Sequence, residues 1–422
     1  MFFPINARRR AQAMLGLAVW LAACTAGAQT TAPTPDAPGP TAAPATRPPD
    51  TDRPAAEPTA TAPATPASSV YLPLIQQSAT ATPEAGAPEA PAAPPASPTP
   101  DWPAPRASLT SSKLGLHTLG PTDPYIMEFV RRARPRVVKS VGDFGWLAEV
   151  KQVSPETITI GRHLDQEEHW VLTTDPAAAG VVFVEQHLEA YRLNPQVDYW
   201  EGWNELGLGT PERMTWFALF EASRACAMQQ HGFRAAVGGF STGVPEYDLM
   251  DEFLPALEAA QRCGGLFHLH EYASPTFQCG VAVNVPGLIP GAPALGVPAG
   301  PLSLRYRFWY EGLLKPRGLG GLPLVISELG IDGLAPSPAC DDPGYPGWKL
   351  YSDWWVQRGY GPSGPQAYVN VLGWYDQEMR NDPYVLGAAI FTTGALEPQQ
   401  QWHPFELHDA LIPLAHYLVS QP

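Results

Sequence analysis

The chain has 422 residues and 45% of them are hydrophobic, so it is long enough for one large domain with a sizeable core and further sequence besides. Acidic residues outnumber basic ones, 41 to 26, and the formal net charge of −15 disfavours nucleic acids and other polyanions as partners. The sequence has neither a CxxC pair nor a histidine-rich cluster nor a phosphate-cradling glycine loop, so we expect no metal and no cofactor.

The first segment has the pattern of an export signal. Arg8, Arg9 and Arg10 precede an apolar run at residues 11–23, which is too short to span a bilayer as a helix. The run ends in LAAC, which resembles the lipobox of bacterial lipoproteins, in which the cysteine becomes the lipidated N-terminus. Residues 1–23 are therefore predicted to be a lipoprotein-type signal peptide, and Cys24 a lipid anchor that holds an extracytoplasmic protein on the cell membrane. The alternative is ordinary secretion with cleavage a few residues later.

Residues 24–109 are rich in proline, alanine and threonine, with few charges and no apolar period. Such a segment cannot bury enough surface to offset the entropy of ordering, so we predict a disordered tether. A short apolar island at residues 70–75 (VYLPLI) interrupts it, and the sequence assigns no role to that island.

From residue 110 onward, eight apolar runs alternate with helical patterns, which is typical of a parallel α/β barrel. The predicted strands are residues 113–117, 136–141, 157–162, 197–203, 234–240, 266–271, 322–327 and 385–391. Helices are predicted at residues 124–134, 144–152, 176–191, 212–231, 247–262, 304–314, 366–380 and 405–419. Residues 110–422 are thus expected to form a monomeric (β/α)8 TIM barrel.

Two connections, residues 273–301 and 330–364, are far longer than the usual few residues. Both follow strands, so both are expected at the face where such barrels carry their chemistry. The second contains several aromatic residues, Trp348 and Trp354 among them, which could stack on the flat faces of sugar rings. The alternative is that these side chains only pack the loop onto the barrel.

Two stretches end buried strands on a glutamate: residues 199–206 (YWEGWNEL) with Glu205, and residues 322–330 (LPLVISELG) with Glu328. By strand alternation, Glu201, Trp203 and Glu205 share one face. Glu205 and Glu328 would end strands four and seven of the barrel, close enough for their side chains to face one another. Two facing carboxylates suit cleavage of a glycosidic bond, one as proton donor and the other as nucleophile. Two unrelated strand-end glutamates are the alternative.

With these residues in place, the chain from about residue 114 to its end resembles clan A, the retaining glycoside hydrolases with an eight-fold barrel. Trp203, Asn204 and Glu205 are similar to the Asn-Glu pair of strand four in that clan. The resemblance implies that Glu205 is the general acid/base, that Asn204 holds the sugar 2-hydroxyl, and that Glu328 is the nucleophile. His270 and Tyr272 match the strand-six pattern His-x-Tyr, whose tyrosine hydroxyl contacts the nucleophile.

Supporting positions follow from the same comparison. Arg162, on strand three, is a weaker candidate for a second partner of Glu328, and Glu201 is expected inside the barrel, where Lys139 either pairs with it or points outward. His117 either contacts a sugar hydroxyl or is structural. Relatives commonly have proline at the position of Leu206 and tryptophan at the position of Phe391, a role that Trp402 could fill.

Four cysteines remain if Cys24 is lipidated, and in an exported protein an even number allows two disulfides. Three pairings are possible. Cys279 and Cys340 lie in the two long loops at the same face and could be joined, while Cys226 and Cys263 could pair on the outside of the barrel.

The sequence therefore predicts an exported, membrane-anchored glycoside hydrolase that acts on a carbohydrate by a retaining two-glutamate mechanism. The alternative from another class is a non-catalytic carbohydrate-binding surface lipoprotein on a glycosidase-like barrel. A protein that only binds has no need of both glutamates.

Overall fold

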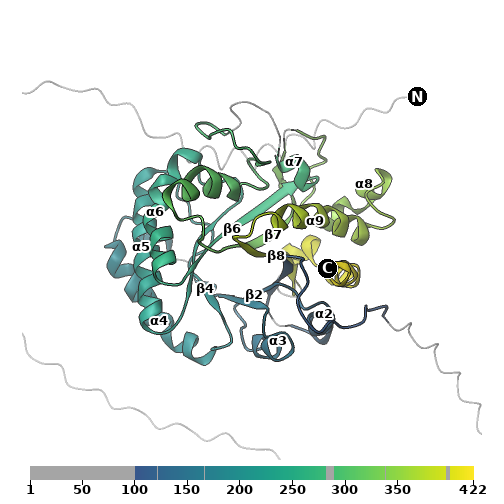
Figure 1. Cartoon of the computed structure of the whole chain (residues 1–422), viewed down its shortest axis with the longest axis horizontal. Coiled ribbons are helices and arrows are strands. Elements are labelled where there is room, and N and C mark those ends of the chain that lie inside the picture. The colour runs from purple at the N-terminus through teal and green to yellow at the C-terminus, as the bar shows by residue number, and fades with distance from the viewer. Residues whose placement is uncertain (1–99, 121, 166, 282–288, 338, 396–399) are drawn as a thin grey trace, which may run out of the picture. The chain divides into compact units, whose positions relative to one another are not determined.

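The computed structural model describes residues 100–120, 122–165, 167–281, 289–337, 339–395 and 400–422. Eight parallel strands close into a barrel in chain order, with β1 pairing to β8 (Figure 1). The predicted (β/α)8 barrel is therefore confirmed. The signal segment with Cys24 and the island at residues 70–75 lie outside the described residues. Within the described ranges, no helix has the length and apolarity needed to cross a membrane.

All eight strands lie where the apolar runs predicted them. They are β1 (Leu114–Leu119), β2 (Val137–Val141), β3 (Ile158–Arg162), β4 (Tyr199–Glu201), β5 (Ala235–Phe240), β6 (Leu266–Ser274), β7 (Leu324–Pro336) and β8 (Val385–Thr393). The largest differences from prediction are β4, which ends at Glu201 rather than residue 203, and β7, which continues to Pro336.

Helices surround the barrel, and α4, α5 and α6 lie side by side along one flank (Figure 1). The α-helices are α2 (Pro124–Ala133), α3 (Leu147–Val153), α4 (Pro176–Leu193), α5 (Pro211–Gln230), α6 (Leu254–Arg262), α7 (Phe277–Val281), α8 (Ser352–Gln357), α9 (Gly364–Arg380) and α10 (His408–Ser420). The helices of other types are η1 (Glu168–Trp170), η2 (Tyr247–Leu249), η3 (Asp251–Phe253), η5 (Lys315–Arg317), η6 (Trp348–Tyr351) and η7 (Gln400–Phe405), which are 3-10 helices, and η4 (Phe308–Leu314), a π-helix.

Local start signals fix several of these helices. Asp123, Asp175, Thr210 and Ser363 accept a backbone N–H at the starts of α2, α4, α5 and α9, and each of these helices has a proline in its first turn. Residues 247–262, predicted as one helix, are instead divided into η2, η3 and α6. A proline in the first turn of α6 lacks the N–H that would continue a helix from upstream.

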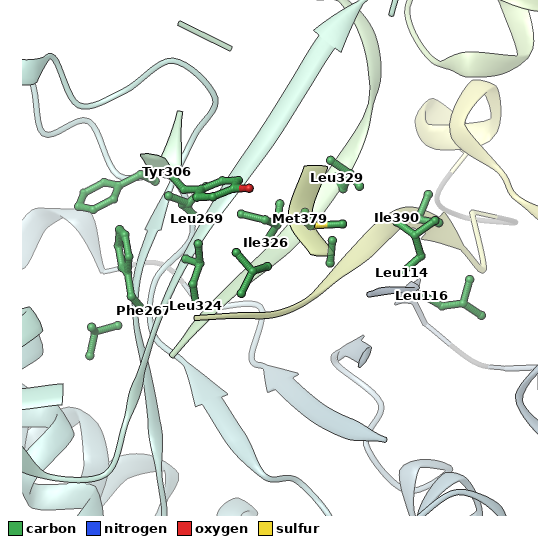
Figure 2. Close-up of a cluster of buried hydrophobic side chains, with 14 of the residues drawn as sticks. Leu114, Leu116, Phe267, Leu269, Tyr306, Leu324, Ile326, Leu329, Met379 and Ile390 are labelled. Atoms are coloured by element: carbon green, nitrogen blue, oxygen red, sulfur yellow. The ribbon is translucent and has the colours of Figure 1, made fainter. Parts of the chain in front are cut away.

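Apolar side chains fill two layers. The larger one lies between the strands and the helices, and Figure 2 shows part of it, including Leu269 of β6, Ile326 of β7 and Ile390 of β8. The smaller one fills the inside of the barrel at the end where the strands begin, with Val325 as its β7 member. Further along the strands the buried side chains include polar ones, such as Lys139 and Glu201, beside a small apolar cluster at the ends of β1, β2 and β8. Such barrels carry their functional sites at this end.

Residues 100–109, which the composition assigned to the tether, contact the barrel. The Trp102 ring lies 4.9 Å from the Tyr125 ring, and Arg106 donates a hydrogen bond of 2.9 Å to the carbonyl of Val419. The Arg134 guanidinium in turn donates to the carbonyl of Arg106 at 2.6 Å. Tryptophan and arginine within a proline-rich segment are the only signals in the sequence for this attachment.

Both predicted disulfides are confirmed. Cys226 and Cys263 join α5 to the end of α6, with Cα atoms 5.1 Å apart. Cys279 and Cys340 are 5.8 Å apart and link the segments that follow β6 and β7. These two strands stay paired beyond the barrel, as far as Ser274 beside Pro336, so parts of the two predicted long loops form a two-stranded extension. The second disulfide ties the two chain segments that leave this extension.

Replacing Cys279 and Cys340 together by serine should lower the free energy of unfolding by about 2–4 kcal/mol, since the closed loop is 61 residues long. The matched control is the double replacement of Cys226 and Cys263, which opens a loop of 37 residues on the outer face. Denaturant unfolding would compare the stabilities. An unchanged stability of the first variant would contradict a stabilising role of the Cys279–Cys340 disulfide.

Stability should fall as the pH rises from about 6.5 through about 9, because of His408. Its Nδ1 lies 2.7 Å from Glu406 and its Nε2 2.6 Å from Asp123, which ties α10 to the start of α2. The hydrogen bond to Glu406, followed by that to Asp123, raises the pKa of His408 to about 9 against the opposing effect of burial. A raised folded-state pKa stabilises the protein below pH 6.5 and this contribution disappears above pH 9. Thermal unfolding would check this: the melting temperature should change less between pH 6 and pH 9 in His408→Gln than in the unmodified protein.

Candidate active site

Glu328 enters the barrel interior through a β-bulge. Ile326 pairs with Leu269 and Glu328 with His270, so Ser327 is an extra residue in β7. Val325 points inward, and the Ser327 hydroxyl bonds Nδ1 of the interior His268 at 2.8 Å. Alternation alone would turn Glu328 toward the helices, and the extra residue keeps it on the inner side.

Both carboxylate oxygens of Glu328 are held by donors. Oε1 accepts from Arg162 Nη1 at 2.9 Å and from Lys139 Nζ at 3.2 Å, and Oε2 accepts from the Tyr272 hydroxyl at 2.9 Å. Burial favours the neutral acid, but His270, Lys139 and Arg162 outweigh it and hold the pKa of Glu328 well below its usual range. The side chain is therefore a buried carboxylate anion.

A second buried carboxylate lies below Glu328. Glu201 is 2.9 Å from Lys139 Nζ and 3.4 Å from Nδ1 of His268. Burial opposes its ionisation, yet the charge of Lys139 lowers the pKa of Glu201 to about 2. The expected pairing of Lys139 with Glu201 inside the barrel is confirmed, and the same ammonium also reaches Glu328.

Glu205 follows β4 in a left-handed backbone conformation, with φ of 51°, and its N–H donates to the carbonyl of Gly239 at 2.9 Å. Its carboxylate is 2.7 Å from Nδ1 of His270, and its side chain is 33% exposed. The expectation that Trp203 shares its face is wrong. β4 ends at Glu201, and Trp203 turns outward to stack on Phe220 at 4.2 Å.

Glu205, four residues after the end of β4, and Glu328, in the part of β7 that belongs to the barrel, lie close together. The ligand atoms of Glu205, His270 and Glu328 all lie within 4.8 Å of one another, so a carboxylate oxygen of each glutamate lies within that distance of the other. The same three residues could converge on a metal ion. Two cations already contact Glu328, however, and their repulsion disfavours a divalent cation at this carboxylate.

A cavity of about 390 Å³ opens above the two glutamates. Its wall combines the polar groups of the site with apolar side chains of the surrounding loops. The lining residues are Leu119, Arg162, Leu164, Asn204, Glu205, Ser241, Thr242, Tyr272, Glu328, Asp332, Leu334, Ala335, Phe391, Trp402 and Phe405. This composition, apolar walls with a few convergent polar groups, is typical of small-molecule sites.

The structure brings together Glu205, Glu328, Asn204, Arg162 and Tyr272 in this wall. Asn204 accepts a hydrogen bond from the same Arg162 nitrogen that contacts Glu328. His270 lies behind them, bonded to Glu205. These are side chains that the clan resemblance selected.

Other candidates fall in different places. His117 is fully buried 3.6 Å from Glu328 and bonds Thr392 at 2.7 Å, and burial holds its pKa well below the usual range. Trp402 lines the cavity beside Phe391, with ring centroids 5.3 Å apart. Trp348 is buried, where it donates to the carbonyl of Phe405, and Trp354 stacks under Arg358, so both pack the loop and neither is part of this wall.

Sequence reasoning missed two contributors. The contact between Lys139 and Glu328 depends on the bulge in β7, which no pattern in the sequence indicates. Asp332 lines the cavity four residues after Glu328, in the extension of β7, for which the sequence predicts a loop. The alternation of Glu328, Gly330, Asp332 and Leu334 could have indicated a strand.

No protein-family model matches the sequence, and no curated protein matches it. Among solved structures, a family 39 glycoside hydrolase from the gut symbiont Bacteroides cellulosilyticus WH2 aligns at 11% identity and a TM-score of 0.44, over 73% of this chain and 63% of that one. A glucosidase from Croceicoccus marinus aligns at 12% identity and a TM-score of 0.42, over 76% of this chain and 69% of that one. A glycoside hydrolase family 5 enzyme from Prevotella bryantii aligns at 10% identity and a TM-score of 0.37, over 75% of this chain and 95% of that one. Identities and scores this low assign no function to this chain, so its function has to be inferred from the geometry of its own side chains.

Proposed function

We propose that the protein is a glycoside hydrolase that cleaves O-glycosidic bonds with retention of configuration, with Glu328 as nucleophile and Glu205 as acid/base. The observation that carries this proposal is the spacing of the two glutamates, since one carboxylate oxygen of Glu205 lies within 4.8 Å of one carboxylate oxygen of Glu328. Retaining enzymes hold their carboxyl groups about 5–5.5 Å apart, whereas inverting enzymes need about 6.5–9.5 Å to admit a water.

The two carboxyl groups would act in sequence. The anionic Glu328 attacks the anomeric carbon while the protonated Glu205 donates its proton to the departing oxygen, which leaves a glycosyl ester on Glu328. Glu205, now ionised, removes a proton from water as that water attacks the anomeric carbon and releases Glu328. Each turnover consumes one water and returns both groups to their initial states.

The neighbours of the two glutamates support this division of roles. Lys139, Arg162 and Tyr272 keep Glu328 ionised, as a nucleophile requires. The Glu205 carboxylate is bonded to His270 and is partly exposed, which suits a group that exchanges protons with water. Asn204, fixed by Arg162, is placed in the wall to bind the sugar 2-hydroxyl.

We further propose that the protein works outside the cytoplasm, anchored by lipid at Cys24 or secreted. Two disulfides support an oxidising compartment. Mass spectrometry tests the anchor. The mature protein should begin at a lipid-modified Cys24, and the Cys24→Ser variant should lack this modification. A mature protein that begins beyond Cys24 and partitions into the medium would favour ordinary secretion.

The test of the activity is a screen of the mature protein against aryl glycosides and polysaccharides. The anomeric configuration of the first-formed product is then read by NMR. Retention is expected. An inverted first product would contradict the two-step mechanism, and a protein that binds oligosaccharides but cleaves none would favour the carbohydrate-binding lipoprotein instead.

A further inference from the structure

Asp332 occupies a special position in the cavity wall. It lies on the part of β7 that continues beyond the barrel, on the same side as Glu328, and both line the cavity. Gly330 lies between them, where any side chain would meet the Tyr272 ring at 2.9 Å. With a rise of about 3.3 Å per residue, Asp332 is about 13 Å further along the strand than Glu328. It therefore faces a part of the substrate that is remote from the cleaved bond.

The orientation of the Asp332 carboxyl is fixed by its own turn. Oδ1 accepts the N–H of Leu334 at 3.0 Å. In the described parts of the chain, no lysine, arginine or histidine forms an ion pair with this carboxyl. Burial and the neighbouring Asp342 raise the pKa of Asp332 above its usual range, as expected for a carboxyl that is largely shielded from water and has no cation beside it.

The charges in the cavity wall are strongly unequal. Three carboxyl groups line it, those of Glu205, Glu328 and Asp332, and in the proposed mechanism Glu328 and Asp332 carry the negative charge when the substrate binds. Among the described lining residues Arg162 is the sole cation. Arg162 is already committed, because one of its nitrogens contacts both Glu328 and Asn204. A carboxylate on the substrate would therefore lie next to negative charge, with no uncommitted cation among the described lining residues to pair with it. Such repulsion can exclude a ligand just as favourable contacts can select another.

We infer that Asp332 is a substrate-binding residue that accepts hydrogen bonds from hydroxyl groups of an uncharged sugar and excludes sugars that carry a carboxylate. The inference rests on the proposed glycosidase function and adds the class of its substrate. A carboxylate accepts from two hydroxyl groups at once, and hydrogen bonds to an ionised acceptor are stronger than those between neutral groups. The apolar side chains of Leu334 and Trp402 complete a wall that suits the C–H faces of a neutral ring.

The experiment compares matched pairs of substrates that differ only in the group at C6. The probes are 4-nitrophenyl glucosides and galactosides, in both anomeric forms, and the corresponding glucuronides and galacturonides. The unmodified protein should cleave one or more neutral members and leave the matching uronide essentially untouched. In Asp332→Asn, kcat/KM for the neutral substrate should fall about 10- to 100-fold. The uronide-to-neutral activity ratio should rise, a readout that a merely structural role would not move.

Asp353→Asn is the control, since Asp353 is an exposed aspartate on α8 outside the cavity wall. It should change neither kcat/KM nor the ratio, and both variants should unfold at a similar temperature to the unmodified protein. The inference is overturned if the unmodified protein prefers the uronide. It is also overturned if Asp332→Asn leaves both kcat/KM and the uronide-to-neutral activity ratio unchanged.

Failure of the proposed function gives a different result. If the unmodified protein cleaves none of the probes and none of the polysaccharides of the wider screen, catalysis is contradicted, and calorimetric titration with neutral and uronic oligosaccharides decides the inference. The role of Asp332 is supported if the protein binds the neutral ligand more tightly than the uronic one and if Asp332→Asn reduces this preference. Tighter binding of the uronic ligand, or no effect of the substitution, overturns it.

Discussion

Glu328→Ala should lower turnover of every substrate by about 10⁴-fold or more, because no group remains to form the glycosyl ester. Lys139, Arg162 and Tyr272 fix the carboxylate of Glu328. Glu201, the buried carboxylate next to it, is paired with Lys139 below the site. Steady-state rates with an aryl glycoside and with the natural glycan, once found, would measure the loss.

The matched control is Glu258→Ala, which removes an exposed glutamate of α6. It should retain full activity. Circular dichroism of Glu328→Ala should show an intact fold, since Glu201 still faces Lys139 in that variant. A folded Glu328→Ala protein that keeps a tenth or more of the original activity would rule out Glu328 as nucleophile.

Glu205→Ala should lose activity in a way that depends on the leaving group. An aryl group that departs without protonation still allows the glycosyl ester to form, but its hydrolysis becomes slow because no base activates water. An initial burst of phenolate followed by a slow steady rate is expected. Substrates with poor leaving groups should lose activity in the first step as well.

Added azide should rescue the slow step in Glu205→Ala, since a small anionic nucleophile needs no general base and fits the space vacated by the carboxylate. The product should be a β-glycosyl azide if the substrate is a β-glycoside. Azide rescue in Glu328→Ala with an inverted product, and none in Glu205→Ala, would mean that the two roles are reversed. Stopped-flow absorbance and NMR of the azide adduct distinguish these results.

The barrel itself could be predicted from the sequence, because each buried strand is a short apolar run and several helices begin with a capping side chain and a proline. The predicted positions of the two long loops indicated the pairing of Cys279 with Cys340, and those of two outer helices the pairing of Cys226 with Cys263. Glu205 and Glu328 could be identified because each is the carboxylate that ends an apolar run. These features are local in the sequence, so composition and spacing reveal them.

Features that depend on strand irregularity could not be predicted. Alternation placed Trp203 beside Glu205, but the chain leaves the strand after Glu201 and Trp203 packs among the helices. The bulge at Ser327 arises from pairing with β6, a partner distant in sequence. Periodicity within one segment carries no information about such pairing.

The aromatic residues after β7 show the same limit. Trp348 and Trp354 have the composition of a sugar-stacking surface, yet one is buried against Phe405 and the other packs with Arg358. A large aromatic side chain offers the same apolar area to a ligand or to its own protein. Only the path of the loop decides between the two, and Trp402, from another loop, is the tryptophan that lines the cavity.

The position of Lys139 has a consequence for the whole reaction cycle. Its ammonium lies 2.9 Å from Glu201 and 3.2 Å from Glu328, deep in the barrel where a lone charge would be costly. When Glu328 becomes an ester in the proposed mechanism, its negative charge disappears, but Glu201 still neutralises the ammonium. Glu201 therefore serves as a permanent counter-ion, so that charge can leave and return at the nucleophile while the interior beneath it stays electrically balanced and need not rearrange.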